Sequence, residues 1–348
     1  MFVYWFLFVI PLYFLFGKKS GGLNTSEFEW RIFGFFLVIF IGLRFQVGAD
    51  WFTYLEVLEI DKNIQWHDLY LARDPGYTVV SWFSLWLGMD IYGVNLICAA
   101  IFTGGLISLC RAQPYPWLAV LVAVPYLVIV VAMGYTRQAA AMGFMMYGFK
   151  YLLGGHTTKY LVLILLAGML HKTAFVFAAF ALFQPTGGKL KRVVGVVSLI
   201  YLLGLAYLVE QADTFMLNYV QNPMNSAGGL IRVLMNFPPA LIILANWKKW
   251  RERFDDRWFW ALFALIGVVC LPLASNASTA VDRMALYLIP LQLVVWARLP
   301  VLAKPYIGRT FVFIMVSVCY IAVMFTWLFY GVHASYWLPY DNILIPTL

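Results

Sequence analysis

Residues 44–77, RFQVGADWFTYLEVLEIDKNIQWHDLYLARDPGY, form one of the few long polar intervals in a strongly apolar chain. Arg44 and Arg73 stand where hydrophobic segments meet this interval. Its acidic and amide-bearing side chains are Gln46, Asp50, Glu56, Glu59, Asp61, Asp68 and Asp74. The rest of the chain is predicted to be a membrane body that presents this interval, and a few partner loops, to one compartment.

Composition places the chain among membrane proteins. Of 348 residues, 63% are hydrophobic and 11% are charged, and the mean hydropathy is +0.82. A soluble domain is about half apolar and a quarter charged. The apolar runs of roughly 15–24 residues match helices that cross ~30 Å of hydrocarbon. They lie near 1–16, 30–44, 75–88, 91–110, 117–133, 137–153, 159–183, 193–210, 229–246, 257–273, 281–298 and 309–331.

These runs predict an all-α polytopic membrane bundle of about 11–12 membrane segments. No internal repeat is visible, so residues 1–348 are interpreted as one integral domain. The four cysteines stand singly in apolar runs, so neither a disulfide framework nor a metal site is expected. Walker, dinucleotide-binding and zinc-protease motifs are absent from the sequence, and no cofactor is predicted. The net charge of +8 falls in short loops, a pattern typical of membrane orientation rather than nucleic-acid binding.

Basic residues indicate an orientation. With Lys18 and Lys19 in the cytoplasm, all but seven of the 24 basic residues fall on that side, as the positive-inside rule requires. Both termini, the 45–74 loop and a second loop at 211–228 are then outside. The seven outer basic residues are Arg44, Lys62, Arg73, Arg137, Lys172, Arg232 and Arg283.

This orientation requires two irregular segments. Residues 75–110 must cross once although Gly88 and Asp90 divide them, and residues 159–183 must leave and return on two short arms. Short or re-entrant helices of this kind are tolerated where they line a polar cavity, and they often mark binding sites. Here they flank His171 and the entry at 74–77.

Five of the outer basic residues are arginines, on the side where positive charge is normally scarce. Each could pair with a neighbouring carboxylate, such as Asp74 beside Arg73 or Asp282 beside Arg283. Five together favour a shared anionic ligand, because guanidinium groups bind phosphate oxygens through paired, charge-assisted hydrogen bonds. A pyrophosphate at the membrane surface fits, and Lys172 beside His171 adds a further charge.

Two residues are candidate bases. His171 lies among apolar residues, where ionisable groups are usually functional, although it could simply cap a broken helix. Asp74 before Pro75 is explained by helix capping, whereas Asp50 has no such evident role. We favour His171 as the base, because it can be neutral near pH 7. Asp50 then positions the acceptor or an arginine, since a loop should bury it little and arginines should lower its pKa.

Seven motifs carry a family resemblance in order along nearly the whole chain. They are RFQVGADWFTY (44–54), RDPGY (73–77), GYTRQAAAMGF (134–144), MLHKTAFVF (169–177), GGLIRVLMN (228–236), DRMALYL (282–288) and WLPYDNIL (337–344). Together they resemble the EpsG-type, Wzy-like polymerases of bacterial polysaccharides. In the second motif, aspartate replaces the glutamate that this family often has before the proline.

The resemblance implies a GT-C-like glycosyltransferase in the bacterial plasma membrane, with its active site outside. Such enzymes join oligosaccharide repeat units carried on undecaprenyl pyrophosphate, without a metal or a nucleotide sugar. The implied partners are these lipid-linked glycans, membrane lipid, a flippase and a chain-length regulator. Matched positions are Arg44, Gly48, Asp50, Tyr54, Asp74, Pro75, Gly76, Tyr77, Arg137, His171, Arg232, Arg283 and Tyr287.

Two alternative functions remain. An O-antigen ligase would use the same donor but usually carries a larger outer loop late in the chain than 211–228. A lipid-linked oligosaccharide flippase or other transporter would place charge along the bundle interior and have pseudo-symmetric halves. In this sequence, charge gathers mainly at one face and no repeat is visible.

Overall fold

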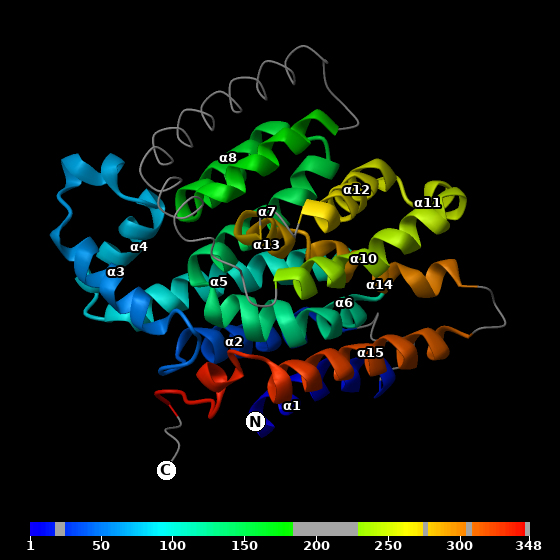
Figure 1. Ribbon diagram of the computed structural model, residues 1–348, viewed down its shortest axis with the longest axis horizontal. Coiled ribbons are helices and arrows are strands. Elements are labelled where there is room, and N and C mark those ends of the chain that lie inside the picture. Colours follow the sequence, from blue (N-terminus) through cyan, green and yellow to red (C-terminus); the bar gives the residue numbers. More distant parts are fainter. Residues whose placement is uncertain (18–24, 184–228, 274–277, 304–307, 345–348) are drawn as a thin grey trace.

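The computed structural model describes residues 1–17, 25–183, 229–273, 278–303 and 308–344 (Figure 1). The regular elements within these ranges are helices, together with one isolated β-bridge between Arg44 and Asn342. The all-α prediction is therefore confirmed. The predicted span at 193–210 and the predicted outer loop at 211–228 lie outside the described residues.

The helices follow the apolar runs closely, because each run is bounded by Gly, Pro or charged residues that interrupt a helix. Their bounds are α1 (Phe2–Leu12), η1 (Tyr13–Gly17), α2 (Glu27–Gly42), α3 (Trp51–Asn63), η2 (Trp66–Leu71), α4 (Pro75–Trp86), α5 (Asp90–Arg111), α6 (Pro116–Ala123), η3 (Val124–Ala132), α7 (Thr136–Leu153), α8 (Thr157–Leu170), η4 (Lys172–Phe183), α10 (Gly229–Ala245), α11 (Trp247–Arg253), α12 (Arg257–Leu273), α13 (Ser278–Tyr287), α14 (Pro290–Leu302), α15 (Arg309–Tyr330) and η7 (Ala334–Trp337).

Three of the described helical segments are long and apolar enough to cross a membrane: Asp90–Arg111, Arg283–Leu302 and Arg309–Tyr330. A fourth is possible if α10 and α11, which meet at an 80° bend, form one broken span. Several other apolar helices, α8 among them, are shorter. The structure is thus a polytopic helical bundle, and the predicted total of crossings stays a prediction.

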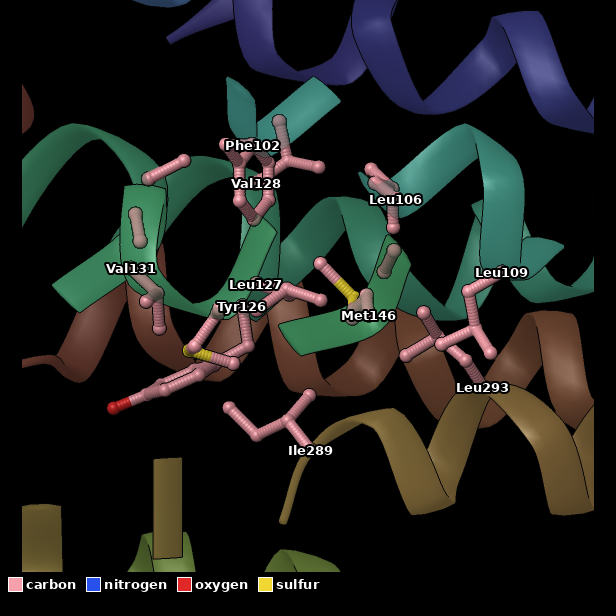
Figure 2. Close-up of a cluster of buried hydrophobic side chains, with 14 of the residues drawn as sticks. Phe102, Leu106, Leu109, Tyr126, Leu127, Val128, Val131, Met146, Ile289 and Leu293 are labelled. Carbon is pink, nitrogen blue, oxygen red and sulfur yellow. The ribbon is translucent and has the colours of Figure 1, made fainter. Parts of the chain in front are cut away.

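The core forms where α5 and α7 pack side by side. A Cβ on Gly105 or Gly143 would collide with the backbone of the other helix, so only glycine permits this approach. Small residues that let helix backbones touch are the usual device of membrane interiors, where dispersion replaces the hydrophobic effect. Figure 2 shows Phe102 and Leu106 of α5 gathered with residues of η3, α7 and α14 around this contact.

The polar interval at 45–74, predicted as a loop, is largely helical. It contains α3 and η2, and α3 is fastened to α4 through buried Asp61. The Asp61 carboxylate accepts a hydrogen bond from Thr78 Oγ1 at 2.9 Å, and its backbone carbonyl accepts one from Trp82 Nε1 at 2.8 Å. These bonds fix the polar interval against the bundle and so give its side chains defined positions.

The C-terminal segment holds the start of the same interval. The Phe45 amide donates to the Asp341 carbonyl at 3.0 Å, and the Gly48 amide donates to the Tyr336 carbonyl at 2.8 Å. Gly48 has a φ of +108°, and a Cβ there would meet the Met133 carbonyl oxygen at 2.4 Å. Glycine is required here for both its backbone conformation and its lack of a side chain. The first and last sequence motifs are therefore one structural unit.

Both predicted helix breaks are present. Gly88 and Asp90 have positive φ values of +68° and +44°, and they separate α4 from α5. His171 separates α8 from η4 with an extended backbone. A re-entrant path for residues 159–183 remains a prediction, because the structure contains no membrane.

Candidate functional site

Arg137, in the first turn of α7, is the centre of the candidate site. Its Nη1 donates to Asp74 Oδ2 at 2.8 Å, and the two side chains are 17% and 4% exposed. The guanidinium also lies over the rings of Tyr54 and Tyr77, each with its centroid 5.6 Å away. Cation–π contacts of this kind strengthen when they are shielded from water. Arg137 is therefore held by one carboxylate and two aromatic rings.

Asp74 arrives at this position from the start of α4. It is the residue before Pro75 at the helix start, as predicted, yet its side chain makes no capping hydrogen bond. It binds Arg137, 63 residues away in sequence, rather than the adjacent Arg73. A Cβ on Gly76 would meet Met169 at 2.8 Å, so the start of α4 rests directly against the end of α8. This packing brings Asp74 toward His171.

His171 lies at that end of α8. Its ring centroid is 6.4 Å from that of Tyr287, whose hydroxyl receives a 3.3 Å hydrogen bond from Thr173 Oγ1. Within the described chain, the buried Nδ1 atom has no hydrogen-bond partner. Burial, followed by the positive charges of Arg283 and Arg137, lowers the pKa of His171 to about 3. The imidazole is thus neutral at physiological pH and is a weak proton acceptor.

Asp50 stands at the N-terminal end of α3 without capping it. Burial raises the pKa of its carboxyl group, and the charges of Arg137 and Arg283 oppose this effect without reversing it. One premise behind the preference for His171 as base is confirmed, because the imidazole is neutral near pH 7, whereas the premise about the burial and the pKa of Asp50 is wrong. Asp50 is buried more than a loop position suggests, and burial together with the nearby cations makes the histidine a weak base.

Arg44 was expected to bind an anionic ligand, and its surroundings favour a structural role instead. It is 1% exposed. The guanidinium is directed at four acceptors within the protein: Ile41 O at 2.6 Å, Thr136 Oγ1 at 2.8 Å, Val47 O at 3.1 Å and Asn95 Oδ1 at 3.3 Å. The bond to Thr136 ties the start of the polar interval to the residue before Arg137. Arg44 therefore has a structural role: it holds the backbone next to Arg137 in place.

Arg232 lies on the flank of the site. Its Nε donates to the Tyr126 hydroxyl at 2.6 Å, and its guanidinium lies 5.9 Å from the centroid of Tyr135. Tyr135 is two residues before Arg137, so Arg232 contacts the segment that leads into α7.

Arg283 belongs to α13, which is joined to α7 by a 3.0 Å hydrogen bond from Gln138 Nε2 to the Arg283 carbonyl. Its side chain is exposed, as is that of Arg73. We call the basic residues of the site the cation cluster. It consists of Arg73, Arg137, Lys172 and Arg283, all of which lower the pKa of His171.

The structure brings this cluster together with Asp74, Tyr54 and Tyr77, which contact Arg137, and with His171 and Tyr287, whose rings are neighbours. Asp50 lies within reach of the charges of Arg137 and Arg283. Sequence reasoning missed Thr136, Thr173 and Tyr135, although all three stand inside the recognised motifs. It assigned no role to His333, whose charge acts on the pKa of Asp50. Tyr126 stands inside an apolar run and gave no signal at all.

The sequence model of one protein family spans nearly the entire chain, matching residues 28–342 of 348. The chain belongs to the EpsG family. Comparisons with curated proteins and with solved structures give no match. Membership of the EpsG family supports a polysaccharide polymerase-like role for this membrane protein. The matched region contains every residue of the cation cluster and both candidate bases.

The EpsG-family site draws its side chains from α3, α4, α7, α13 and the junction between α8 and η4. Among the described residues, no group of three or more His, Cys, Asp or Glu side chains is placed to hold a metal ion. The available chemistry is therefore fixed positive charge, two carboxylates, one neutral imidazole and three buried phenols.

Proposed function

We propose that this EpsG-family protein polymerises oligosaccharide repeat units carried on undecaprenyl pyrophosphate. In the reaction, the bond between the donor sugar C1 and the pyrophosphate oxygen breaks. A new bond forms between that C1 and a hydroxyl oxygen of a second lipid-linked unit. The hydroxyl proton goes to a base, and the lipid pyrophosphate leaves with the bonding electrons. This is a GT-C-type glycosyl transfer that needs no nucleotide sugar.

The observation that carries the proposal is the excess of positive charge around Arg137. Four basic side chains stand against two carboxylates, and one of those, Asp74, already engages Arg137. A departing pyrophosphate gains negative charge as the C1–O bond breaks, and fixed cations stabilise that charge without reorganisation. The aromatic contacts hold Arg137 in one orientation, so its donors remain available in defined directions.

For proton transfer, we assign Asp50 as the base and His171 as a neutral hydrogen-bond donor that positions substrate. A base works best when its pKa approaches the ambient pH, and burial moves Asp50 in that direction. A neutral imidazole whose pKa is lowered by burial and by surrounding positive charge can still donate an N–H to an oxygen anion. This reverses the roles expected from sequence and keeps both residues in the site.

The site is proposed to face outside, in the plasma membrane of a bacterium. Cysteine labelling tests this with an impermeant reagent, in a variant without native cysteines because Cys319 is exposed. Lys62→Cys should label in intact cells and Lys249→Cys only after permeabilisation. The opposite pattern would invert the orientation and remove the proposed access to exported substrates. A flippase that supplies the donor and a chain-length regulator are proposed partners.

The function itself is tested with purified protein in proteoliposomes and synthetic undecaprenyl-pyrophosphate repeat units. A ladder of lengthening glycans should appear without added nucleotide and should persist in EDTA. Arg137→Lys, at matched reconstitution, should remove the ladder. Transfer onto a lipid A core without lengthening would indicate a ligase. Movement of intact units across the bilayer without bond formation would indicate a transporter, and either result overturns the proposal.

A further inference from the structure

A charged cavity lies at the other end of the bundle, distant from Arg137. It occupies ≈ 430 Å³ between the C-terminal ends of α5 and α7 and the start of α12. Thirteen residues of α7 separate Lys150 in this cavity from Arg137, about 20 Å along a helix. In Figure 1, α11 and α12 lie at the end away from α3 and α4.

The cavity has an apolar interior and a charged rim. Leu109, Met146, Phe149 and Leu153 form apolar walls, and Lys150 and Arg253 stand exposed among its lining residues. Its volume is within the range of about 300–1,000 Å³ that small-molecule sites occupy. Such a combination suits an amphipathic molecule with a negatively charged head.

Two acidic residues, Asp255 and Asp256, also line this cavity. Asp256 is neutralised by Arg298, whose Nη1 and Nη2 each reach one carboxylate oxygen at 2.6 Å. Asp255 is outnumbered by Lys150 and Arg253, so the rim keeps an excess of positive charge. The cavity therefore favours an anion over a neutral or cationic head group.

Helix α11 carries further positive charge beside the cavity. It turns 80° from α10, which suits a helix that lies along a membrane surface while α10 enters it. Its Lys248, Lys249, Arg251 and Arg253 are exposed, whereas Trp250 is completely buried. The buried Trp250 fixes α11 to the protein, and exposed basic residues at a membrane surface attract anionic lipid head groups. The last of these cations, Arg253, is the one that lines the cavity.

We propose that this cavity binds an anionic glycerophospholipid, with its phosphate between Lys150 and Arg253 and an acyl chain along the walls formed by α5 and α7. The lipid would join the ends of α5 and α7 to α11 and α12. The inference does not depend on the catalytic proposal, because no residue of the cation cluster takes part.

The test measures lipid binding to purified full-length protein by native mass spectrometry after addition of phosphatidylglycerol or phosphatidylcholine. Phosphatidylglycerol should be retained and phosphatidylcholine should not. Lys150→Ala and Arg253→Ala should each weaken retention about fivefold, the effect of removing one interfacial cation. Arg251→Ala is the matched control, because Arg251 is exposed on the same helix but does not line the cavity.

A steric variant separates the cavity from surface charge. Ala112 lines the cavity from an exposed position, so Ala112→Phe should block the acyl chain without changing charge or repacking the core. Lys150→Arg should retain the lipid, which shows that loss in Lys150→Ala is not a folding defect. Equal loss in Arg251→Ala, equal retention of phosphatidylcholine, full retention in Ala112→Phe, or displacement by millimolar inorganic phosphate would each overturn the proposal.

Discussion

Arg137, which is half-buried, and Arg298, which is buried, each bind one aspartate at opposite ends of the same bundle. All three nitrogens of the Arg298 guanidinium donate hydrogen bonds within the protein. Nη1 and Nη2 donate to Asp256 at 2.6 Å, and Nε donates to Gln113 Oε1 at 3.0 Å. Its guanidinium also stacks 4.4 Å from the ring centroid of Phe254. Arg137 has a single 2.8 Å bond to Asp74, and its charge acts on His171 together with those of three further cations. Complete pairing makes Arg298 a structural link, whereas partial pairing leaves Arg137 able to take a second anion.

Charge alone does not distinguish the two arginines. A buried pair whose hydrogen bonds are all satisfied has no reason to bind a ligand and is costly to break. A pair with remaining donors and surplus positive charge is stabilised when an anion arrives. An arginine–aspartate pair thus has a structural role at one end of the bundle and an anion-binding role at the other.

The largest expected effect concerns the base at the Arg137 end. Asp50→Asn should reduce the rate of glycan lengthening by roughly 10²–10⁴-fold, since a positioned base contributes about that much. His171→Gln retains a neutral hydrogen-bonding side chain and should cost much less. The measurement is single-turnover extension of lipid-linked units with purified protein. A severe loss in His171→Gln together with near-normal Asp50→Asn would restore histidine as the base.

Arg137→Lys should lower the same rate by about 10²–10³-fold, comparable to the loss of one donor from a preorganised anion site. Lysine keeps the charge but loses the paired donors and the planar stacking on Tyr54 and Tyr77. Arg298→Lys provides the contrast: the activity per folded molecule should change little. If both variants lose activity equally at matched folding, the distinction between the two ends fails.

Stability should respond in the opposite way. Arg298→Met leaves the half-buried Asp256 carboxylate with only the 2.8 Å hydrogen bond from Trp260 Nε1. This should cost about 2–3 kcal/mol of unfolding free energy, less than for a fully buried pair. The double variant Arg298→Met with Asp256→Leu should recover much of that loss, because no charge then remains buried. Thermal unfolding in detergent measures both. An Arg298→Met protein as stable as wild type would mean that the pair is not a structural link.

The smallest effect is a pH dependence that belongs to the Arg137 end. His171 has a folded-state pKa of about 3, while an unfolded histidine titrates near 6.5. Between these values the unfolded state binds more protons, so stability falls as pH falls, by up to about 1.4 kcal/mol per pH unit. His171→Gln should remove this dependence. Asp50 and Asp74 titrate in both proteins, so the difference between melting curves at pH 7 and pH 4.5 isolates the histidine. Parallel shifts in the two proteins would contradict the assignment.

Much of the fold was predictable from local sequence. Long apolar runs predict helices because a helix is the segment that satisfies its own backbone hydrogen bonds in hydrocarbon. Gly88, with Asp90 close by, and His171 marked breaks that the structure contains. Proline after Asp74 predicted the start of α4, and the structure begins the helix there. The motifs also contained the cation cluster, because Arg73, Arg137 and Lys172 stand at helix ends and Arg283 stands beside an apolar run.

Pairing and burial were decided only by tertiary packing. The sequence placed Asp74 beside Arg73. In the structure, the start of α4 packs on the end of α8, and the Asp74 carboxylate pairs with Arg137 of α7 instead. Arg44 looked like a ligand-binding arginine and instead lies under the site, because the C-terminal segment and Asn95 enclose it. The pKa directions of Asp50 and His171 depend on desolvation and on charges from distant helices. A local sequence records which groups are present. Only the packed bundle sets the distances and the burial on which electrostatic energies depend.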